Sequence, residues 1–220
     1  MGHNPLEYDG IAEQLYAPVY PIVARAIVER TGKQQGRVLD VGCGGGHLGF
    51  AVLKQGNFTS LSLFDENEQA LDVAQRRAEE RGLAEQVEGA YAGDACTLEL
   101  PAVGGKPFDL IVSRGSMPFW EDQRAAFTNL FGLLAPGGRG YVGGGLGSQL
   151  DGLVYADIAE RMAALRAENG GEGPHLFDRS RSKALDDNTY LELFAELGGT
   201  CEVIANKGEG HWIMFGKLPS

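Results

Sequence analysis

Residues 38–46 constrain the fold of this chain more than any other stretch. They read Val-Leu-Asp-Val-Gly-Cys-Gly-Gly-Gly, an apolar run that ends in a carboxylate and continues into glycines. The apolar run predicts a buried strand, and the glycines predict a turn where a ligand lies directly on the main chain. The fixed positions of the pattern D-x-G-x-G-x-G are Asp40, Gly42, Gly44 and Gly46.

Helical and strand-like segments alternate along the 220 residues, which is typical of an α/β fold with a mostly parallel sheet. The expected strands cover residues 37–41, 60–64, 86–91, 108–113, 139–143, 200–205 and 211–217. The expected helices cover residues 11–31, 46–55, 68–81, 123–134, 150–168 and 188–197. Pro18 and Pro21 should kink or break the first helix, and the last two strands should form an antiparallel hairpin at a sheet edge.

Composition narrows the class of protein. The net charge of -11 argues against nucleic-acid partners, because phosphate contacts need clustered Lys and Arg. No apolar stretch approaches the roughly 18 residues that a membrane span needs, and the N-terminus lacks the regions of a signal peptide. We therefore expect a single cytoplasmic domain over residues 1–220, without membrane partners.

The three cysteines do not indicate a disulfide framework or a metal site. Their number is odd and no C-x-x-C spacing occurs, so buried inert thiols are the first expectation. A role in which the cysteine sulfurs hold a substrate is the weaker alternative. The residues concerned are Cys43, Cys96 and Cys201.

Polar residues follow several of the expected strands, and the carboxyl ends of parallel strands meet at one edge of a sheet. Asp65 ends the second strand, where its two oxygens suit two vicinal ribose hydroxyls. Asp94 follows the third strand and suits an adenine amino group, although a helix cap or turn is an equally good interpretation. Ser113-Arg114-Gly115-Ser116 follows the fourth strand.

The glycines alone do not decide between cofactors. Residues 44–49 also satisfy G-x-G-x-x-G, the pattern of dinucleotide enzymes. Asp40 precedes the glycines, however, and a carboxylate there repels pyrophosphate and attracts a cationic ligand. A P-loop is excluded because no Gly-Lys-Ser/Thr follows. His47 is expected at the N-terminus of the next helix, touching the cofactor region.

These motifs, with Leu-Leu-Ala-Pro-Gly-Gly before the fifth strand, make residues 10–217 similar to class I S-adenosylmethionine-dependent methyltransferases of the small-molecule type. The resemblance implies a Rossmann-like, seven-stranded, mostly parallel sheet with helices on both faces and an antiparallel last strand. It also implies S-adenosyl-L-methionine as the cofactor. The cofactor-binding residues that it implies are Asp40, Gly42, Cys43, Gly44, Gly46, Asp65, Glu66, Asp94, Ala95, Ser113, Arg114 and Gly115.

Two segments resemble lids of the small-molecule members. Residues 1–31 would form N-terminal lid helices, in which Tyr16 and Tyr20 share a face and could cover the sulfonium; core packing is the alternative. Residues 148–187 would form a substrate-lid insert. Its basic cluster consists of His175, Arg179, Arg181 and Lys183. This cluster would either bind an anionic acceptor or form a solvated charged run.

The acceptor side is less defined. Phe119 and Trp120 are expected as walls of the substrate pocket, with plain packing of the next helix as the alternative. His211 and His175 are the candidate general bases, although lone histidines are more often structural. No metal site is expected.

The sequence thus predicts transfer of a methyl group from S-adenosylmethionine to a small-molecule acceptor by in-line displacement, in a monomer or homodimer. A non-catalytic protein of the same fold that binds S-adenosylmethionine or S-adenosylhomocysteine is the alternative. A NAD-dependent oxidoreductase is the third interpretation.

Overall fold

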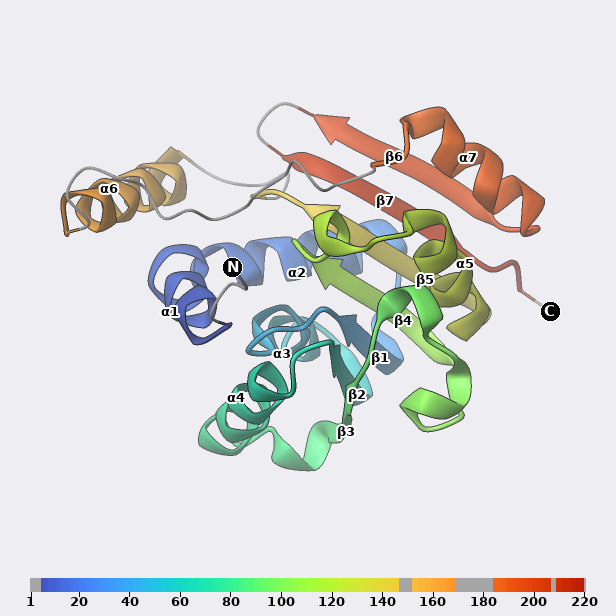
Figure 1. Cartoon of the computed structure of the whole chain (residues 1–220), viewed down its shortest axis with the longest axis horizontal. Coiled ribbons are helices and arrows are strands. Elements are labelled where there is room, and N and C mark those ends of the chain that lie inside the picture. Colours follow the sequence, from blue (N-terminus) through green and yellow to red (C-terminus); the bar gives the residue numbers. More distant parts are fainter. Residues whose placement is uncertain (1–4, 147–151, 169–183, 207–208, 220) are drawn as a thin grey trace.

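The computed structural model describes residues 5–146, 152–168, 184–206 and 209–219, and a seven-stranded sheet forms their centre (Figure 1). The strand order is β3-β2-β1-β4-β5-β7-β6. The strands are β1 (Gln35–Val41), β2 (Asn57–Asp65), β3 (Val87–Ala92), β4 (Phe108–Arg114), β5 (Leu134–Gly144), β6 (Thr200–Asn206) and β7 (Gly210–Gly216). The predicted fold class is confirmed.

Strands β1 to β5 pair in parallel, whereas β7 is antiparallel to both of its neighbours, β5 and β6. The expected closing hairpin is therefore present at one sheet edge, and β7 rather than β6 makes the contact with β5. The chain proceeds from β1 outward to β3 and then returns to β4 on the other side of β1. This reversal places a crevice at the carboxyl ends of β1 and β4.

The helices lie on both faces of the sheet (Figure 1). Their bounds are α1 (Pro5–Tyr16), α2 (Val19–Thr31), α3 (His47–Leu53), α4 (Glu68–Glu80), α5 (Gln123–Leu133), α6 (Gly152–Glu168) and α7 (Asp187–Glu196). One hydrophobic cluster joins the sheet to α2 and α3, and a second joins its other face to α5 and α7. None of the helices in the described residues has the length and apolarity of a membrane span.

The predicted break in the N-terminal helical segment is observed between α1 and α2. Pro18 is the N-cap residue of α2, and Pro21 lies in its first turn, where a missing backbone N–H removes no intrahelical hydrogen bond. Tyr16 ends α1 and Tyr20 begins α2. The two tyrosines thus stand on different helices. The prediction from their spacing, that they share one helix face, is wrong.

Strand β5 begins at Leu134, well before the expected start at Arg139. Leu134 pairs with Phe108 across a register shift, and both side chains are buried in the cluster under α5 and α7. Residues 135–138 have no register partner on β4 and Gly137 has φ +71°, so the turn-like Ala-Pro-Gly-Gly composition forms an irregularity inside β5 instead of preceding the strand.

Phe127 of α5 is the centre of the second cluster. Its ring is fully buried and meets four other aromatic rings edge-on at centroid distances of 5.2–5.9 Å. Those rings belong to Trp120, Tyr190, Phe194 and Phe215. Phe127 therefore joins α5, α7, β7 and the segment after β4.

We expect Phe127→Ala to lower the free energy of unfolding by about 3–5 kcal/mol, because it removes a buried ring and leaves a cavity. Urea denaturation monitored by circular dichroism measures this change. Phe119→Ala is the matched control, because the Phe119 side chain is 51% exposed and its loss should cost far less. Equal losses in the two variants would contradict the packing described here.

Candidate active site

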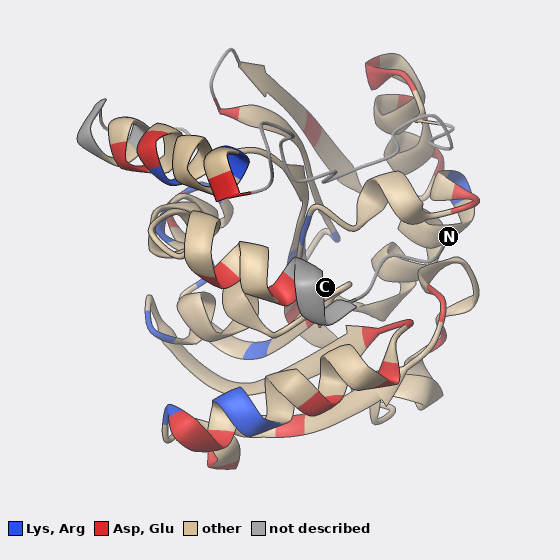
Figure 2. Cartoon of the chain, turned by 60° about the vertical axis from the view of Figure 1, so that its left-hand side comes forward, with Lys and Arg blue, Asp and Glu red and all other residues tan. Residues whose placement is uncertain are grey.

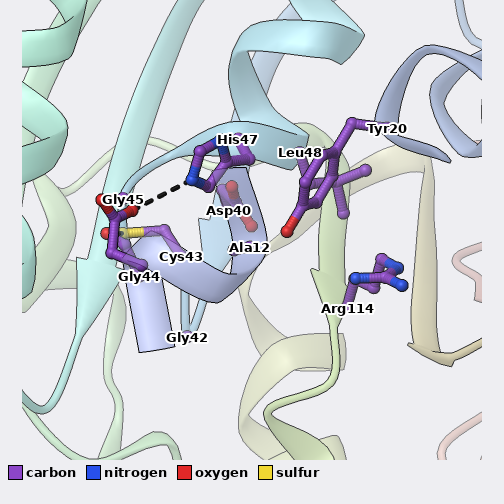
Figure 3. Close-up of a pocket in the computed structure, with 11 residues that line it drawn as sticks. Ala12, Tyr20, Asp40, Gly42, Cys43, Gly44, Gly45, His47, Leu48 and Arg114 are labelled. Carbon is purple, nitrogen blue, oxygen red and sulfur yellow. Dashed lines mark hydrogen bonds and ion pairs between the residues drawn. The ribbon is translucent and has the colours of Figure 1, made fainter. Parts of the chain in front are cut away.

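A pocket opens at the carboxyl ends of β1 and β4, where the strand order reverses (Figure 3). Its floor is the glycine loop, defined here as residues 42–46, together with Asp40 of β1. Arg114 enters from the end of β4. The helices α1, α2 and α3 supply the other lining residues, which are Asp9, Ala12, Tyr20, His47 and Leu48.

The glycines of the loop are needed for different reasons. A Cβ atom on Gly42 would lie 2.2 Å from Cβ of Ser116, and one on Gly46 would lie 2.5 Å from the ring of Phe50. Gly44 has φ +50°, and a Cβ atom there would meet no atom of the chain within 4 Å. Packing therefore explains Gly42 and Gly46, whereas Gly44 faces open space in the pocket.

Backbone donors tie the glycine loop to the end of β2. The N–H groups of Gly42 and Cys43 both donate to the carbonyl oxygen of Phe64, at 2.8 and 3.1 Å. Gly44 N donates to Asp65 Oδ2 at 2.8 Å. Asn67 N donates to the second oxygen, Oδ1, at 3.0 Å. Asp65 therefore fixes the loop, a role that sequence reasoning missed. Burial raises the pKa of Asp65, and these N–H donors oppose that shift.

Asp40 is buried beneath the loop, with 1% of its surface exposed. Its Oδ2 accepts a hydrogen bond of 2.8 Å from Gly49 N, in the first turn of α3. Burial raises the pKa of Asp40 to about 7, the Gly49 N–H opposes this shift, and the negative charge of Asp65 adds to it. The N-terminal, positive end of the α3 dipole also lies beside this carboxylate and favours its negative charge.

Arg114 lies against two aromatic rings. Its guanidinium carbon is 4.8 Å from the ring centroid of Tyr16 and 5.2 Å from that of Tyr20, and its Nε donates to the carbonyl oxygen of Gly145 at 3.0 Å. Among the described residues, no carboxylate forms an ion pair with Arg114. The two tyrosines thus contact a cation of the chain itself, Arg114, and their contact with a sulfonium stays a prediction.

The segment after β4 connects three strand ends. Ser113 Oγ and Ser116 Oγ share a hydrogen bond of 2.6 Å, and Ser116 Oγ donates to the Val41 carbonyl oxygen at 3.3 Å. Gly115 N donates to the Gly143 carbonyl oxygen at 2.7 Å. These bonds hold the ends of β1, β4 and β5 together beside the pocket.

Asp94 caps a short 3-10 helix, Ala95–Thr97, by accepting from Cys96 N at 2.8 Å. The cap that the sequence left as an alternative is thus present, and it uses one carboxylate oxygen. Asp94 is exposed, as is Glu66 after β2, whereas Ala95 is buried. Contacts of Asp94, Ala95 and Glu66 with a cofactor stay predictions.

The residues assigned to the acceptor side are not gathered around the pocket. Trp120 is 7% exposed and packs on Phe127 in the core, whereas Phe119 is exposed. His211 Nε2 lies 2.8 Å from Asp187 Oδ1 at the start of α7. His175, with Arg179, Arg181 and Lys183, lies outside the described residues.

His211 and the pocket lie on different faces of the sheet. The neighbours Trp212 and Ile213 belong to the α2/α3 and α5/α7 clusters respectively, and side chains alternate along a strand. His211 therefore points to the α5/α7 side, whereas Arg114 contacts tyrosines of α1 and α2. The described residues do not bring His211 together with Asp40 or Arg114.

The cysteines are separated, and all three are free thiols. Burial raises the pKa of Cys43, which lines the pocket, with further raising by the charges of Asp40 and Asp65. The described residues contain no cluster of His, Cys, Asp and Glu suited to a metal ion.

The comparisons with known proteins agree with this geometry. Residues 38–138 match the family model described as a methyltransferase domain. An uncharacterized methyltransferase of Mycobacterium tuberculosis (strain H37Rv) is 35% identical over 104 residues, which are 46% of this chain and 46% of that protein. The matched segment therefore spans about half the length of the curated relatives.

Solved structures share the whole fold. A putative S-adenosyl-L-methionine-dependent methyltransferase from Methanococcus maripaludis has a TM-score of 0.75 and 29% identity, covering 100% of this chain and 98% of that one. An S-adenosylmethionine-dependent methyltransferase from Clostridium acetobutylicum has a TM-score of 0.64 and 13% identity, covering 97% and 98%. The second match shows the fold alone.

The sheet order, the glycine loop and the matches agree with one another: residues 38–138 match a methyltransferase domain, and the whole chain has the fold of a putative S-adenosyl-L-methionine-dependent methyltransferase. The methyl donor that this similarity implies is S-adenosylmethionine.

The buried carboxyl of Asp40 predicts a distinctive pH dependence of stability. Its pKa rises from 3.8 to about 7 on folding, so between these pH values the folded protein holds a proton that the unfolded chain has lost. The free energy of unfolding should therefore fall as pH rises from about 4 to 7, by on the order of 2–4 kcal/mol. Asp40→Asn should remove this component of the pH dependence.

Urea denaturation at pH 5 and pH 8 measures the effect. Asp72→Asn, on the exposed face of α4, is the matched control and should keep the wild-type pH dependence. A pH dependence that Asp40→Asn leaves unchanged would show that Asp40 is ionised throughout this range.

Proposed function

We propose that this chain transfers a methyl group from S-adenosylmethionine to a small-molecule acceptor by in-line displacement. The observation that carries the proposal is the open space over Gly44. Among the three glycines of the D-x-G-x-G-x-G pattern, Gly44 is the one where an added Cβ atom would meet no neighbouring atom of the chain. The carboxyl of Asp40 and the guanidinium of Arg114 line the same pocket as Gly44, and the backbone N–H of Gly44 donates to the Asp65 carboxylate. Acidic and basic side chains thus stand beside exposed glycine backbone, which suits a ligand that carries both positive and negative groups.

The residues present fit the cofactor of the family. Asp65 and Glu66 would contact the ribose, and Asp94 and Ala95 the adenine. Asp40 would face the amino group of the methionine moiety, and ionisation of Asp40 would then be favoured by that positive charge. Residues 42–46 would lie beneath the cofactor, with Ser113, Arg114 and Gly115 along its methionine side.

The cofactor, when bound, supplies a methyl group on positively charged sulfur, which is already a good leaving group. The chain has to align the acceptor with that methyl group and to exclude water. Positioning of this kind can lower a barrier by about 7–11 kcal/mol in favourable cases. The rings of Tyr16 and Tyr20 would favour positive charge beside the reacting centre.

The acceptor that fits best is a small molecule. Figure 2 shows Lys and Arg positions scattered among acidic ones along the described helices, without a continuous basic face for phosphates. We assign residues 1–31 to a lid over the cofactor and residues 148–187 to an insert over the acceptor. Phe119, which is exposed after β4, would be the first aromatic contact for that acceptor.

Gly44→Ala tests the cofactor site directly. Its Cβ atom should enter the space over the loop and weaken binding of S-adenosylhomocysteine at least tenfold, measured by titration calorimetry. Gly82→Ala is the matched control, because Gly82 also has positive φ, at +66°, and open surroundings, but lies after α4. Both variants should lose about 1–2 kcal/mol of stability from the left-handed backbone, and only Gly44→Ala should lose affinity.

Production of S-adenosylhomocysteine across a panel of small-molecule acceptors tests turnover. Tight binding without turnover on any acceptor would favour the alternative, a binding protein of methyltransferase fold. Binding of NAD in place of S-adenosylmethionine would overturn the proposal.

A general base is required when the acceptor is an alcohol or a carbon acid. His211 is the candidate from the sequence, but its Nε2 pairs with Asp187 Oδ1 on the α5/α7 side of the sheet, away from the pocket. His211→Gln should therefore leave both kcat with such an acceptor and the affinity for S-adenosylhomocysteine unchanged. A loss of kcat of roughly 10²–10⁴-fold, the usual contribution of a general base, would instead assign the role to His211.

A further inference from the structure

Helix α1 is held on the glycine loop by an ionic cluster that the cofactor motifs do not require. Asp9 forms a two-point pair with Arg77 of α4, with Oδ1–Nη1 and Oδ2–Nη2 distances of 2.9 and 2.7 Å. Asp9 Oδ1 also lies 3.0 Å from His47 Nε2, at the start of α3 (Figure 3). Two-point pairs of this kind are among the stronger ionic contacts and fix the mutual orientation of the two side chains.

Glu13, one turn further along α1, extends the cluster. Its Oε2 is 3.3 Å from His47 Nδ1 and 3.5 Å from Arg77 Nη2, and its Oε1 is 3.5 Å from Arg81 Nη2. Asp9 and Glu13 of α1 therefore face His47 of α3 and the arginines at positions 77 and 81, at the end of α4. We call Asp9, Glu13, His47, Arg77 and Arg81 the latch.

Gly45 links the latch to the glycine loop. Arg77 Nη1 donates to the Gly45 carbonyl oxygen. A Cβ atom on Gly45 would lie 1.9 Å from Asp9 Oδ1 and 2.0 Å from Arg77 Nη1. Gly45 lies outside the fixed positions of D-x-G-x-G-x-G, and the space that it leaves is used by the Asp9–Arg77 pair.

The inner pair of the latch is sheltered from water. Asp9 and Arg77 are 17% and 12% exposed, and the His47 ring stacks on Tyr20 at 5.0 Å. Burial alone would raise the pKa of Asp9, but hydrogen bonds and charge from His47 and Arg77 hold it well below its usual value. Asp9 is thus ionised at neutral pH, and the pair is less screened than a surface ion pair.

The position of α1 narrows the pocket. Asp9 and Ala12 of α1 and Tyr20 of α2 line it together with the glycine loop, and its volume is about 30 Å³. Sites for drug-sized ligands measure roughly 300–1,000 Å³. Entry of an adenosyl ligand therefore requires α1 to move away from the loop.

Helix α6 covers the outer side of α1. Ile158 of α6 is buried in the same cluster as Leu15 of α1, and Arg161 Nη1 donates to the Gln14 carbonyl oxygen at 2.9 Å. Figure 1 shows the two helices side by side. Movement of α1 therefore involves α6, which belongs to the insert assigned to the acceptor.

We propose that the Asp9–Arg77–His47 contacts form a latch that opens for each exchange of cofactor and product, so that their strength sets the rates of exchange. The inference rests on the proposed function, because it takes the pocket to be the cofactor site. The residues act by positioning α1, because they contact one another, the loop backbone and, through His47, the ring of Tyr20.

Asp9→Asn tests the latch. It keeps the size of the side chain and removes the charge that pairs with Arg77 and His47. The association and dissociation rates of S-adenosylhomocysteine should both rise at least fivefold, as measured by stopped-flow fluorescence, with a smaller change in Kd. Unchanged rates would overturn the latch.

Glu196→Gln is the matched control, because it removes an exposed ion pair of 3.1 Å with Arg124, away from the pocket. Its exchange rates should equal those of the wild type. Should Asp9→Asn fail to fold, Glu13→Gln removes the outer contacts alone and should accelerate both rates by a smaller factor; no acceleration would overturn the latch.

5′-Methylthioadenosine separates the latch from direct recognition of the cofactor, because it lacks the amino-acid part. A latch predicts that Asp9→Asn accelerates exchange of both ligands. If Asp9 instead binds the ammonium group, the variant weakens S-adenosylhomocysteine binding and leaves 5′-methylthioadenosine rates unchanged, and the latch is wrong. A wild-type protein that binds neither ligand would contradict the proposed function itself.

Discussion

The site depends on backbone hydrogen bonds that tie the glycine loop to the end of β2 and the first turn of α3 to β1. Gly42 and Cys43 donate to a single carbonyl oxygen of β2, and Gly44 donates to Asp65 at its end. Asp40 accepts from the first turn of α3 directly beneath. Unpaired N–H groups in so buried a turn would be costly, so these carboxylates hold the loop in shape whether or not they also contact a ligand.

Burial of these two carboxyl groups carries a cost, which appears in the raised pKa values of Asp40 and Asp65, and the charge of Asp65 adds to the shift of Asp40. Neutral acceptors could pair the N–H groups of a purely structural turn at a lower cost in free energy. Positive charge supplied by a ligand would relieve the repulsion between Asp40 and Asp65, and this couples cofactor binding to ionisation of the site. The same argument distinguished a cationic ligand from a pyrophosphate when only the sequence was considered.

Periodicity and strand-end chemistry were sufficient to predict the seven strands, the antiparallel closing hairpin and the loop, because each depends on residues close in the chain. The early start of β5 was missed because Leu134 pairs with Phe108 ahead of an irregular Pro-Gly-Gly segment, which from the sequence indicated a turn before the strand. The latch was also missed, since Asp9 and Arg77 are remote in sequence and neither carries a motif. Likewise, the core position of Trp120 reflects Phe127, a partner that no local pattern identifies.

The position of β7 has a consequence for folding. Because β7 lies between β5 and β6, the hydrogen-bonding edge of β5 stays unpaired until residues 210–216 have been synthesised. The aromatic cluster around Phe127 likewise lacks Phe215 until then. The half of the sheet that contains the glycine loop can pair from residues 35–114 alone. A nascent chain thus exposes an open sheet edge late in synthesis, the stage at which such edges are most prone to intermolecular pairing.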